Sequence, residues 1–168
     1  MTHLEEDLEM MRGFVADGHE LLDELEPDLI ELHKSCEEGG TTDIDKLNAV
    51  FRLFHSLKGA AGFLKLHNVV KLTHEAEGML NLVRDGSIML TMDRTDQLCR
   101  ACDFMRTLLG AIEKQGHDRG FEDPVNYFAA ELNAAALDQT TAAALDLDAS
   151  QPPVMTITAE MRLNYIQE

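Results

Sequence analysis

His55 lies in a stretch whose polar residues and glycines recur at helical spacing. In a helix of about 3.6 residues per turn, one stripe would carry Asn48, Arg52, His55, Gly59 and Gly62, with Lys58 at its edge. Apolar residues would fill the opposite side: Leu47, Val50, Phe54, Leu57, Ala61 and Leu64. His55 would therefore face water, and the two glycines would leave room beside it for another molecule. An imidazole exposed in this way is placed to react.

A helical hairpin would bring a carboxylate to this histidine. If the helix that carries His55 and the next helix turn back on each other near residue 65 or 66, His55 lies level with residue 76. His74 and Glu77 bracket that height, on the polar side of the second helix. A facing carboxylate would accept the Nδ1 hydrogen, fix the tautomer and leave the Nε2 lone pair as the nucleophile. We therefore expect Glu77 to orient His55, with His74 adding a donor or tuning Glu77.

Composition limits the class of protein. The chain has 168 residues, enough for one domain of ordinary size and a tail, and a formal net charge of −17. That charge argues against nucleic acid and against an anionic membrane surface as partners. No stretch reaches the roughly 20 apolar residues that a membrane helix needs, and the acidic N-terminus lacks a signal-peptide core. Three cysteines make no disulfide framework, so we expect a cytoplasmic protein.

Apolar periodicity predicts an all-α protein built as an antiparallel, up-down four-helix bundle with a fifth C-terminal helix. The expected helices cover about 4–35, 44–64, 68–84, 93–115 and 123–137. Pro27 should kink the first helix or break it and begin a new first turn. Asp43 and Asp93 are the expected N-caps of the second and fourth helices.

Composition also divides the chain into segments. We expect the four-helix bundle over 1–118, an accessory helix over 119–137 and a flexible acidic linker over 138–158. The last segment, 159–168, is interpreted as the start of a second similar module. Residues 160–168 repeat the pattern of residues 9–17: acid, methionine, three variable residues, aromatic, β-branched, one variable residue, acid.

Two separated motifs resemble histidine phosphotransfer (HPt) domains, especially the N-terminal phosphotransfer domain of CheA-type chemotaxis histidine kinases. That family has a histidine followed by Lys three and Gly four residues later, then a His-x-x-Glu pair. Here the matching residues are His55, Lys58, Gly59, His74 and Glu77, all at the family's spacings, and the resemblance covers about residues 5–115. One departure is Lys65, which stands where the family usually has glycine.

The resemblance implies a phosphorelay module in two-component signalling. His55 would accept a phosphoryl group from the ATP-binding domain of a histidine kinase, in cis or trans, and pass it to an aspartate in the receiver domain of a response regulator. Lys58 would neutralise the phosphoryl oxygens. The receiver would dock over a surface that comprises Arg52, Gly59, Gly62, Phe51 and Phe63.

The same resemblance bears on the enzyme question and on cofactors. The chain has no Gly-rich nucleotide loop and no kinase motif, so we expect the phosphoacceptor domain of a CheA-like kinase and leave open whether it is an enzyme itself. No cofactor or metal is expected in this chain, and ATP and Mg²⁺ would be used by partner domains. Whether the chain is part of a kinase or a free-standing relay stays open, as does the direction of phosphate flow.

The alternative is a non-catalytic or metal-binding helical bundle in which His55, His74 and Glu77 are ligands. Di-iron bundles use Glu-x-x-His pairs with further inward glutamates, whereas here the order is reversed and the residues face outward. The Cys99–Cys102 pair has CxxC spacing, but it falls in mid-helix with no second pair, so we interpret it as core packing. We expect phosphotransfer.

Overall fold

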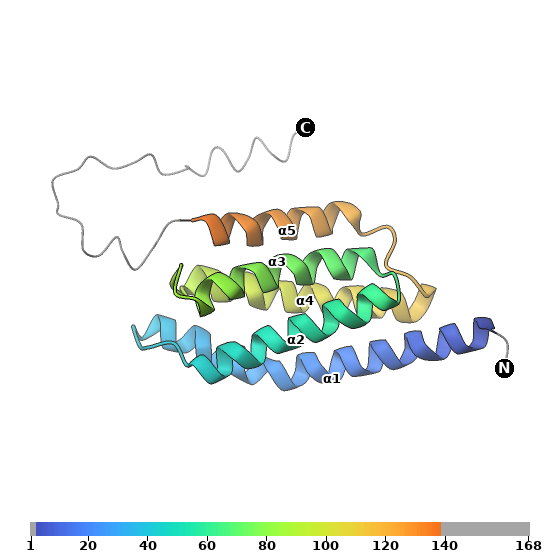
Figure 1. Ribbon diagram of the computed structural model, residues 1–168, viewed down its shortest axis with the longest axis horizontal. Helices are drawn as coiled ribbons and strands as arrows, with labels where there is room; N and C mark the ends of the chain where they lie inside the picture. The colour runs from blue at the N-terminus through green and yellow to red at the C-terminus, as the bar shows by residue number, and fades with distance from the viewer. Residues whose placement is uncertain (1–2, 139–168) are drawn as a thin grey trace.

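Five helices make up the computed structural model, which describes residues 3–138 (Figure 1). They are α1 (His3–Glu37), α2 (Ile44–Phe63), α3 (His67–Arg84), α4 (Met92–Gln115) and α5 (Glu122–Leu137). The described residues contain no strand, which confirms the all-α prediction. The predicted linker from residue 139 on and the predicted second module at 159–168 lie outside the described residues.

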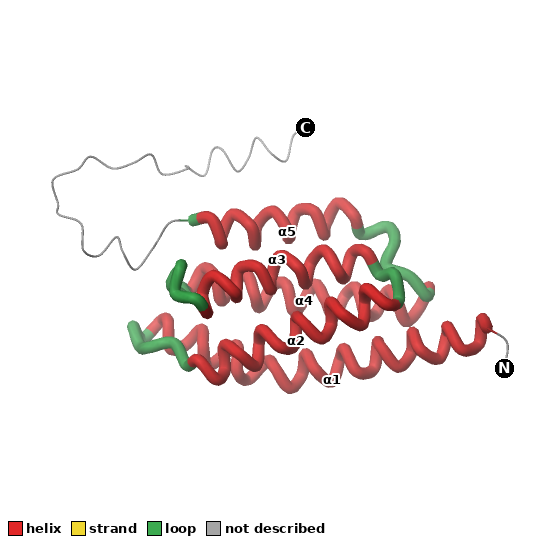
Figure 2. The backbone as a smooth tube through the Cα atoms, viewed as in Figure 1, coloured by secondary structure: helices red, strands yellow, loops and turns green. Residues whose placement is uncertain are grey.

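The first four helices form the antiparallel bundle that the sequence predicted (Figures 1 and 2). α2 packs between α1 and α3, and α4 contacts the same two helices on the other side of the bundle. α5 lies along the outside of the bundle against α3 and α4. α2 and α3 therefore form one side of the bundle as a continuous helical hairpin.

The core holds the helices at fixed rotations about their axes. The apolar residues on the inner face of α3 are all buried: Val69, Leu72, Ala76, Leu80 and Val83. On α2 the side opposite His55 is buried as well, and Phe54 in particular is fully enclosed. Burial of a valine, leucine or phenylalanine side chain stabilises the folded state by about 1.5–3 kcal/mol relative to leaving it exposed. Because these inner stripes are fixed, the polar stripes of α2 and α3 must face outward.

Of the two outcomes predicted for Pro27, a kink or a break in the first helix, the break is wrong. The helix continues through Pro27 instead of breaking there, and buried Leu25 and Leu29 on either side hold it against the bundle. Proline costs one backbone hydrogen bond, which this packing overrides. Leu8, near the N-terminal end of α1, is 45% exposed. The reason is length: the N-terminal turns of α1 extend past the end of the bundle (Figure 1).

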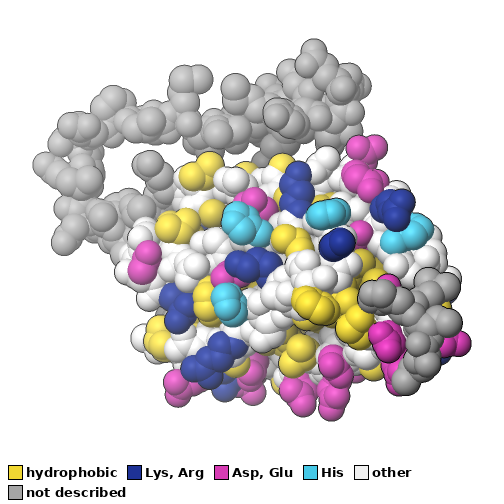
Figure 3. All heavy atoms as spheres, turned by 45° about the vertical axis from the view of Figure 1, so that its right-hand side comes forward, with side chains coloured by type: hydrophobic (Ala, Val, Ile, Leu, Met, Phe, Trp, Pro, Cys, Tyr) yellow, Lys and Arg dark blue, Asp and Glu magenta, His cyan; other side chains and the backbone are white. Residues whose placement is uncertain are grey.

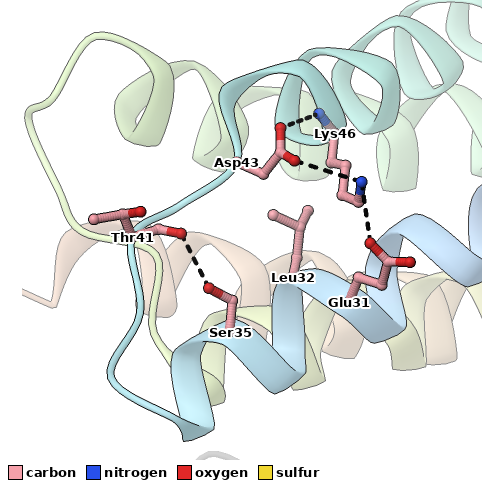
Figure 4. Close-up of a pocket in the computed structure, with 6 residues that line it drawn as sticks. All are labelled: Glu31, Leu32, Ser35, Thr41, Asp43 and Lys46. Carbon is pink, nitrogen blue, oxygen red and sulfur yellow. Dashed lines mark hydrogen bonds and ion pairs between the residues drawn. The ribbon is translucent and has the colours of Figure 1, made fainter.

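The corner between α1 and α2 is fixed by polar contacts (Figure 4). Asp43 caps α2 as predicted, because its Oδ1 accepts from the backbone N–H groups of Asp45 at 3.0 Å and Lys46 at 3.2 Å. The Lys46 ammonium then bridges Asp43, at 3.4 Å, and Glu31 of α1, at 3.0 Å. An open hollow between these side chains and Leu32, Ser35 and Thr41 is visible in the close-up.

The N-terminus of α4 corrects a second prediction. Thr91, not Asp93, is the N-cap, and its hydroxyl oxygen accepts from the Arg94 N–H at 3.3 Å. Asp93 lies in the first turn, where its charge favours the helix dipole without capping it. The two residues are close enough in sequence that spacing alone did not separate them.

The N-terminus of α3 is capped from a distant part of the chain. Its N-cap residue, Leu66, has no side chain that can accept a hydrogen bond. Instead, buried Asp118, in the turn between α4 and α5, accepts from the N–H groups of Asn68 at 2.7 Å and Val69 at 3.0 Å. The Asn68 side chain donates back to the Asp118 carbonyl at 2.6 Å. The start of the helix that carries Glu77 is thus tied to the α4–α5 turn.

The turn from α2 into α3 contains a backbone outlier. Lys65 has φ = 58°, the only positive φ among the described non-glycine residues. Other turns place glycine in this conformation: Gly39, Gly86, Gly116 and Gly120. A residue with a Cβ is destabilised by about 1 kcal/mol in this conformation.

None of the helices within residues 3–138 is long and apolar enough to cross a membrane.

Candidate functional site

Three side chains of the α2–α3 hairpin form one connected cluster. Glu77 of α3 reaches both partners on α2: its Oε1 lies 2.9 Å from His55 Nδ1, and its Oε2 lies 2.6 Å from Lys58 Nζ. The side chains differ in exposure, with His55 at 64%, Lys58 at 28% and Glu77 at 10%. The carboxylate is therefore enclosed in the seam between the helices, while the imidazole projects from it.

Packing explains why the carboxylate is held so firmly. In the sequence of α3, Glu77 lies between the buried residues Ala76 and Leu80. In the sequence of α2, the buried Leu57 lies between His55 and Lys58. Both helices are thus anchored within one turn of the cluster. Residues three and four apart share a helix face, so His55 and Lys58 approach Glu77 from the same side. The predicted register, which placed Glu77 opposite His55, is reproduced in the structure.

Opposing effects act on the charge of Glu77. Burial raises the pKa of this carboxyl, but hydrogen bonds and charge from Lys58 and His55 lower it by more, so the pKa lies below its usual value. Glu77 is accordingly an anion at neutral pH. An anion at Nδ1 favours the tautomer with its hydrogen on that nitrogen and leaves Nε2 with a free lone pair.

His74 is not brought into the cluster. Its side chain is 68% exposed, and its Nδ1 lies 3.4 Å from the carboxylate of Glu75, the next residue along α3. Glu75 in turn accepts from the Asn133 side chain of α5 at 3.5 Å. The spacing of three residues from Glu77 was compatible with a contact, but the structure orients His74 toward Glu75 instead.

The residues predicted to form the docking surface differ in exposure. Gly59 and Gly62 face open space, since a Cβ at either position would meet no atom within 4 Å. Arg52 is exposed, and Phe63 is 76% exposed. Phe51 is half-buried, and its ring stacks on the His55 ring at a centroid distance of 5.9 Å.

Sequence reasoning missed Arg84, at the C-terminal end of α3. Its guanidinium carbon lies 4.0 Å over the centroid of the Phe51 ring, on which it forms a cation–π contact. The four-residue step from Phe51 to His55 is a helical contact spacing that a reader of the sequence could have used. The contact from Arg84 could not be found that way, because it depends on how α3 lies against α2.

Charge is distributed unevenly over the bundle. Residues 44–84, which contain α2 and α3, carry six lysines and arginines against three acidic residues, a net charge of +3. α1 carries two basic against twelve acidic residues, a net charge of −10. Histidine and basic side chains gather on the face that α2 and α3 form, with acidic side chains along its lower edge (Figure 3). The site thus lies in a positive area of a strongly acidic chain.

The described residues offer no ligand set for a metal. Within 3–138 no three histidine, cysteine or carboxylate side chains lie close enough together to hold an ion. The cysteine pair of α4 is turned toward the interior, with Cys102 buried and Cys99 half-buried. Burial raises the pKa of the Cys102 thiol to about 12, and a protonated thiol is a poor metal ligand.

Comparisons with known proteins point to one family. The sequence model of the Hpt domain matches residues 9–147. The sensor histidine kinase CheAY of Helicobacter pylori is 37% identical over 128 residues, which are 75% of this chain and 15% of that protein. The chemotaxis protein CheA of Cereibacter sphaeroides is 29% identical over 127 residues, 76% of this chain and 18% of that protein. The chain spans less than a fifth of the length of these two relatives.

Solved structures agree with this grouping. The solution structure of the histidine phosphotransfer domain of CheA superposes with a TM-score of 0.64 at 28% identity, over 76% of this chain and 91% of that one. The phosphorylated P1 domain of CheA3, crystallised in complex with CheY6 from R. sphaeroides, superposes with a TM-score of 0.67 at 23% identity. That match covers 77% of this chain and 96% of the other, and it shows a shared fold.

Proposed function

The chain belongs to the Hpt domain family, and from this premise we propose that it is a phosphorelay module of two-component signalling. His55 accepts a phosphoryl group from the ATP-binding domain of a histidine kinase and passes it to an aspartate of a response regulator. One observation carries the proposal. The exposed His55 ring is held through Nδ1 by the buried, anionic Glu77, which Lys58 holds on its other oxygen.

The chemistry follows from the direction of the hydrogen bond. With its hydrogen on Nδ1, the His55 ring donates to Glu77 and attacks phosphorus through the Nε2 lone pair. The bond from Nε2 to phosphorus forms while the bond from phosphorus to the donor oxygen breaks, and the donor oxygen leaves with its electron pair. The ring gains a formal positive charge, which the Glu77 carboxylate stabilises. A positioned partner of this kind contributes about 10²-fold or more in rate.

Lys58 balances negative charge on both sides of the reaction. Before transfer its ammonium neutralises Glu77, so that a buried carboxylate is not left unpaired. The lysine stem is flexible, and the same ammonium is one helical turn from His55, within reach of phosphoryl oxygens at Nε2. We place His74 outside this chemistry, because its contact is with Glu75.

The regulator docks over α2. Its aspartate must reach Nε2 of His55, and the open space at Gly59 and Gly62 permits that approach. Exposed Phe63 supplies apolar contact and Arg52 supplies positive charge at opposite ends of the surface. Phe51 contributes only the part of its ring that is not covered.

The parent protein is a CheA-like histidine kinase. The curated relatives are CheA and CheAY proteins, and this chain matches a small part of each. The ATP-binding domain, which uses ATP and Mg²⁺, acts on this module in cis or in trans. The CheA3 domain that shares the fold is phosphorylated and bound to CheY6, which favours a receiver domain as the second partner here.

The test is phosphorylation of the chain by a histidine kinase ATP-binding domain with ATP, followed by mapping of the modified residue. We expect acid-labile, base-stable label on His55 alone, lost in His55→Gln. His74→Gln is the matched control, since it removes an exposed histidine from the same hairpin, and it should label normally. Label on any other histidine, or persistent label in His55→Gln, would refute the assignment.

A further inference from the structure

The His55 ring has a second neighbour besides the carboxylate. Phe51, one helical turn earlier on α2, presents its ring nearly parallel to the imidazole, with 16° between the planes and 5.9 Å between the centroids. Offset rings at this separation attract each other and favour parallel planes. The contact involves a face of the imidazole, whereas Glu77 contacts its edge at Nδ1.

The Phe51 ring is itself in contact with a cation from α3. The Arg84 guanidinium lies over the ring, 4.0 Å from the guanidinium carbon to the centroid. Arg84 is fixed by an amide on each helix: its Nε donates to Asn48 Oδ1 at 2.8 Å, and its Nη1 donates to Asn81 Oδ1 at 3.3 Å. Arg84, Phe51 and His55 are therefore connected by successive contacts that involve both α2 and α3.

The hydrogen bond to Glu77 alone does not fix the orientation of the exposed His55 ring. A hydrogen bond to Glu77 fixes the position of Nδ1, but the ring can still swing about that contact and move Nε2. With 64% of the side chain exposed, core packing does not prevent the swing. Misplacing a reacting atom by about 1 Å can cost 10²-fold in rate. A stacked ring that is itself pinned restricts the plane of the imidazole and therefore the direction of the Nε2 lone pair.

We propose that Phe51 and Arg84 are positioning residues, which hold the plane of His55 so that Nδ1 stays on Glu77 and Nε2 points outward. The proposal deepens the proposed function, on which it rests. It assigns the covered part of the Phe51 ring to the orientation of the nucleophile and leaves only the uncovered part for contact with a regulator. Arg84 acts one step further away, by holding Phe51.

The experiment uses the full chain, two phosphoryl donors and one spectroscopic readout. Phosphorylation of His55 is followed with the kinase ATP-binding domain and ATP, and separately with phosphoramidate, which needs no protein docking. Phosphoramidate transfers its phosphoryl group to Nε2 as its own P–N bond breaks and ammonia leaves. Nitrogen-15 NMR of unphosphorylated protein reports the tautomer of His55.

Phe51→Ala should slow labelling by about tenfold with both donors, equivalent to about 1.4 kcal/mol of barrier, and should reduce the Nδ1–H tautomer. Phe51→Tyr keeps the ring and should restore both the rate and the tautomer. Arg84→Met should act in the same direction by a smaller factor. Circular dichroism checks that each variant remains helical.

Two outcomes would overturn the inference. Slowing of Phe51→Ala with the kinase domain but not with phosphoramidate would make Phe51 a docking contact. An unchanged tautomer and rate in Phe51→Ala would mean that Glu77 alone orients the ring. If the unsubstituted chain takes no label on His55, the proposed function fails. The tautomer measurement still decides whether Phe51 positions the ring.

Discussion

Two faces of the bundle carry clusters of opposite charges, and they differ mainly in burial. On the α2–α3 face, Glu77 is 10% exposed and is contacted by one base on each oxygen. On the α1–α4 face, Arg106 reaches Asp23 at 3.2 Å, Glu26 at 3.3 Å and Asp103 at 3.6 Å. Those three carboxylates are each more than half exposed.

The difference in burial explains why two clusters of acidic and basic side chains constrain their members to different degrees. Exposed ion pairs are screened by water and salt and contribute about 0–1 kcal/mol, so the Arg106 cluster constrains little. An enclosed carboxylate keeps its direction, because any other position would leave a charge unpaired in a poorly solvated seam. Enclosure of Glu77, more than the number of charges, makes the α2–α3 cluster able to fix a tautomer.

The largest expected difference between the two faces concerns these carboxylate clusters. Glu77→Gln keeps the shape of the side chain but removes the anion at Nδ1, so phosphorylation of His55 should slow by about 10²-fold. Arg106→Met disrupts the cluster on the other face and should leave the rate within about twofold. Both are measured as initial rates of labelling. Equal labelling rates for Glu77→Gln and the unsubstituted chain would remove Glu77 from the mechanism.

A second prediction uses the exposed glycines. Gly62 on α2 and Gly13 on α1 both face open space, since a Cβ at either position would meet no atom within 4 Å. Gly62→Trp should slow transfer from phosphorylated chain to its regulator by about tenfold, the equivalent of about 1.4 kcal/mol of lost docking. Gly13→Trp is the control and should transfer normally. Similar transfer by both variants would mean that the regulator approaches across another face.

The smallest expected effect contrasts two helix ends. Lys65, after α2, and Gly116, after α4, both have positive φ, at 58° and 73°. Lys65→Gly should raise the free energy of unfolding by about 1 kcal/mol, and Gly116→Ala should lower it by a similar amount. Urea unfolding measures both. A loss of stability in Lys65→Gly would show that the lysine side chain compensates its own strain.

Much of the site could be predicted because it depends on local periodicity and one hairpin. The apolar stripes fixed the outward faces of α2 and α3, and a short turn fixed their register, which together placed Glu77 opposite His55. Asp43 was recognisable as a cap because the helix pattern begins directly after it. These inferences require no knowledge of how distant segments meet.

What sequence reasoning missed depends on side-chain choice or on distant packing. The pattern allowed His74 to reach Glu77, but rotamers decide such contacts, and the structure pairs His74 with Glu75. The bond from Lys58 to Glu77 needed the same information. Arg84 comes to Phe51 only once α3 lies against α2. The continuity of α1 through Pro27 reflects packing that local propensity does not contain.

The capping of α3 by Asp118 has a consequence for the order of events during synthesis. The backbone N–H of Asn68 donates to the Asp118 carboxylate, which is synthesised 50 residues later. At about 5–20 residues per second, the ribosome delivers that carboxylate only several seconds after α3 itself. Until then the first turn of α3 has no internal acceptor for these N–H groups and should fray, so the nascent hairpin is expected to mature late. A pulse of protease during translation should therefore cut near residue 67 in shorter nascent chains and spare it in those that have passed Asp118.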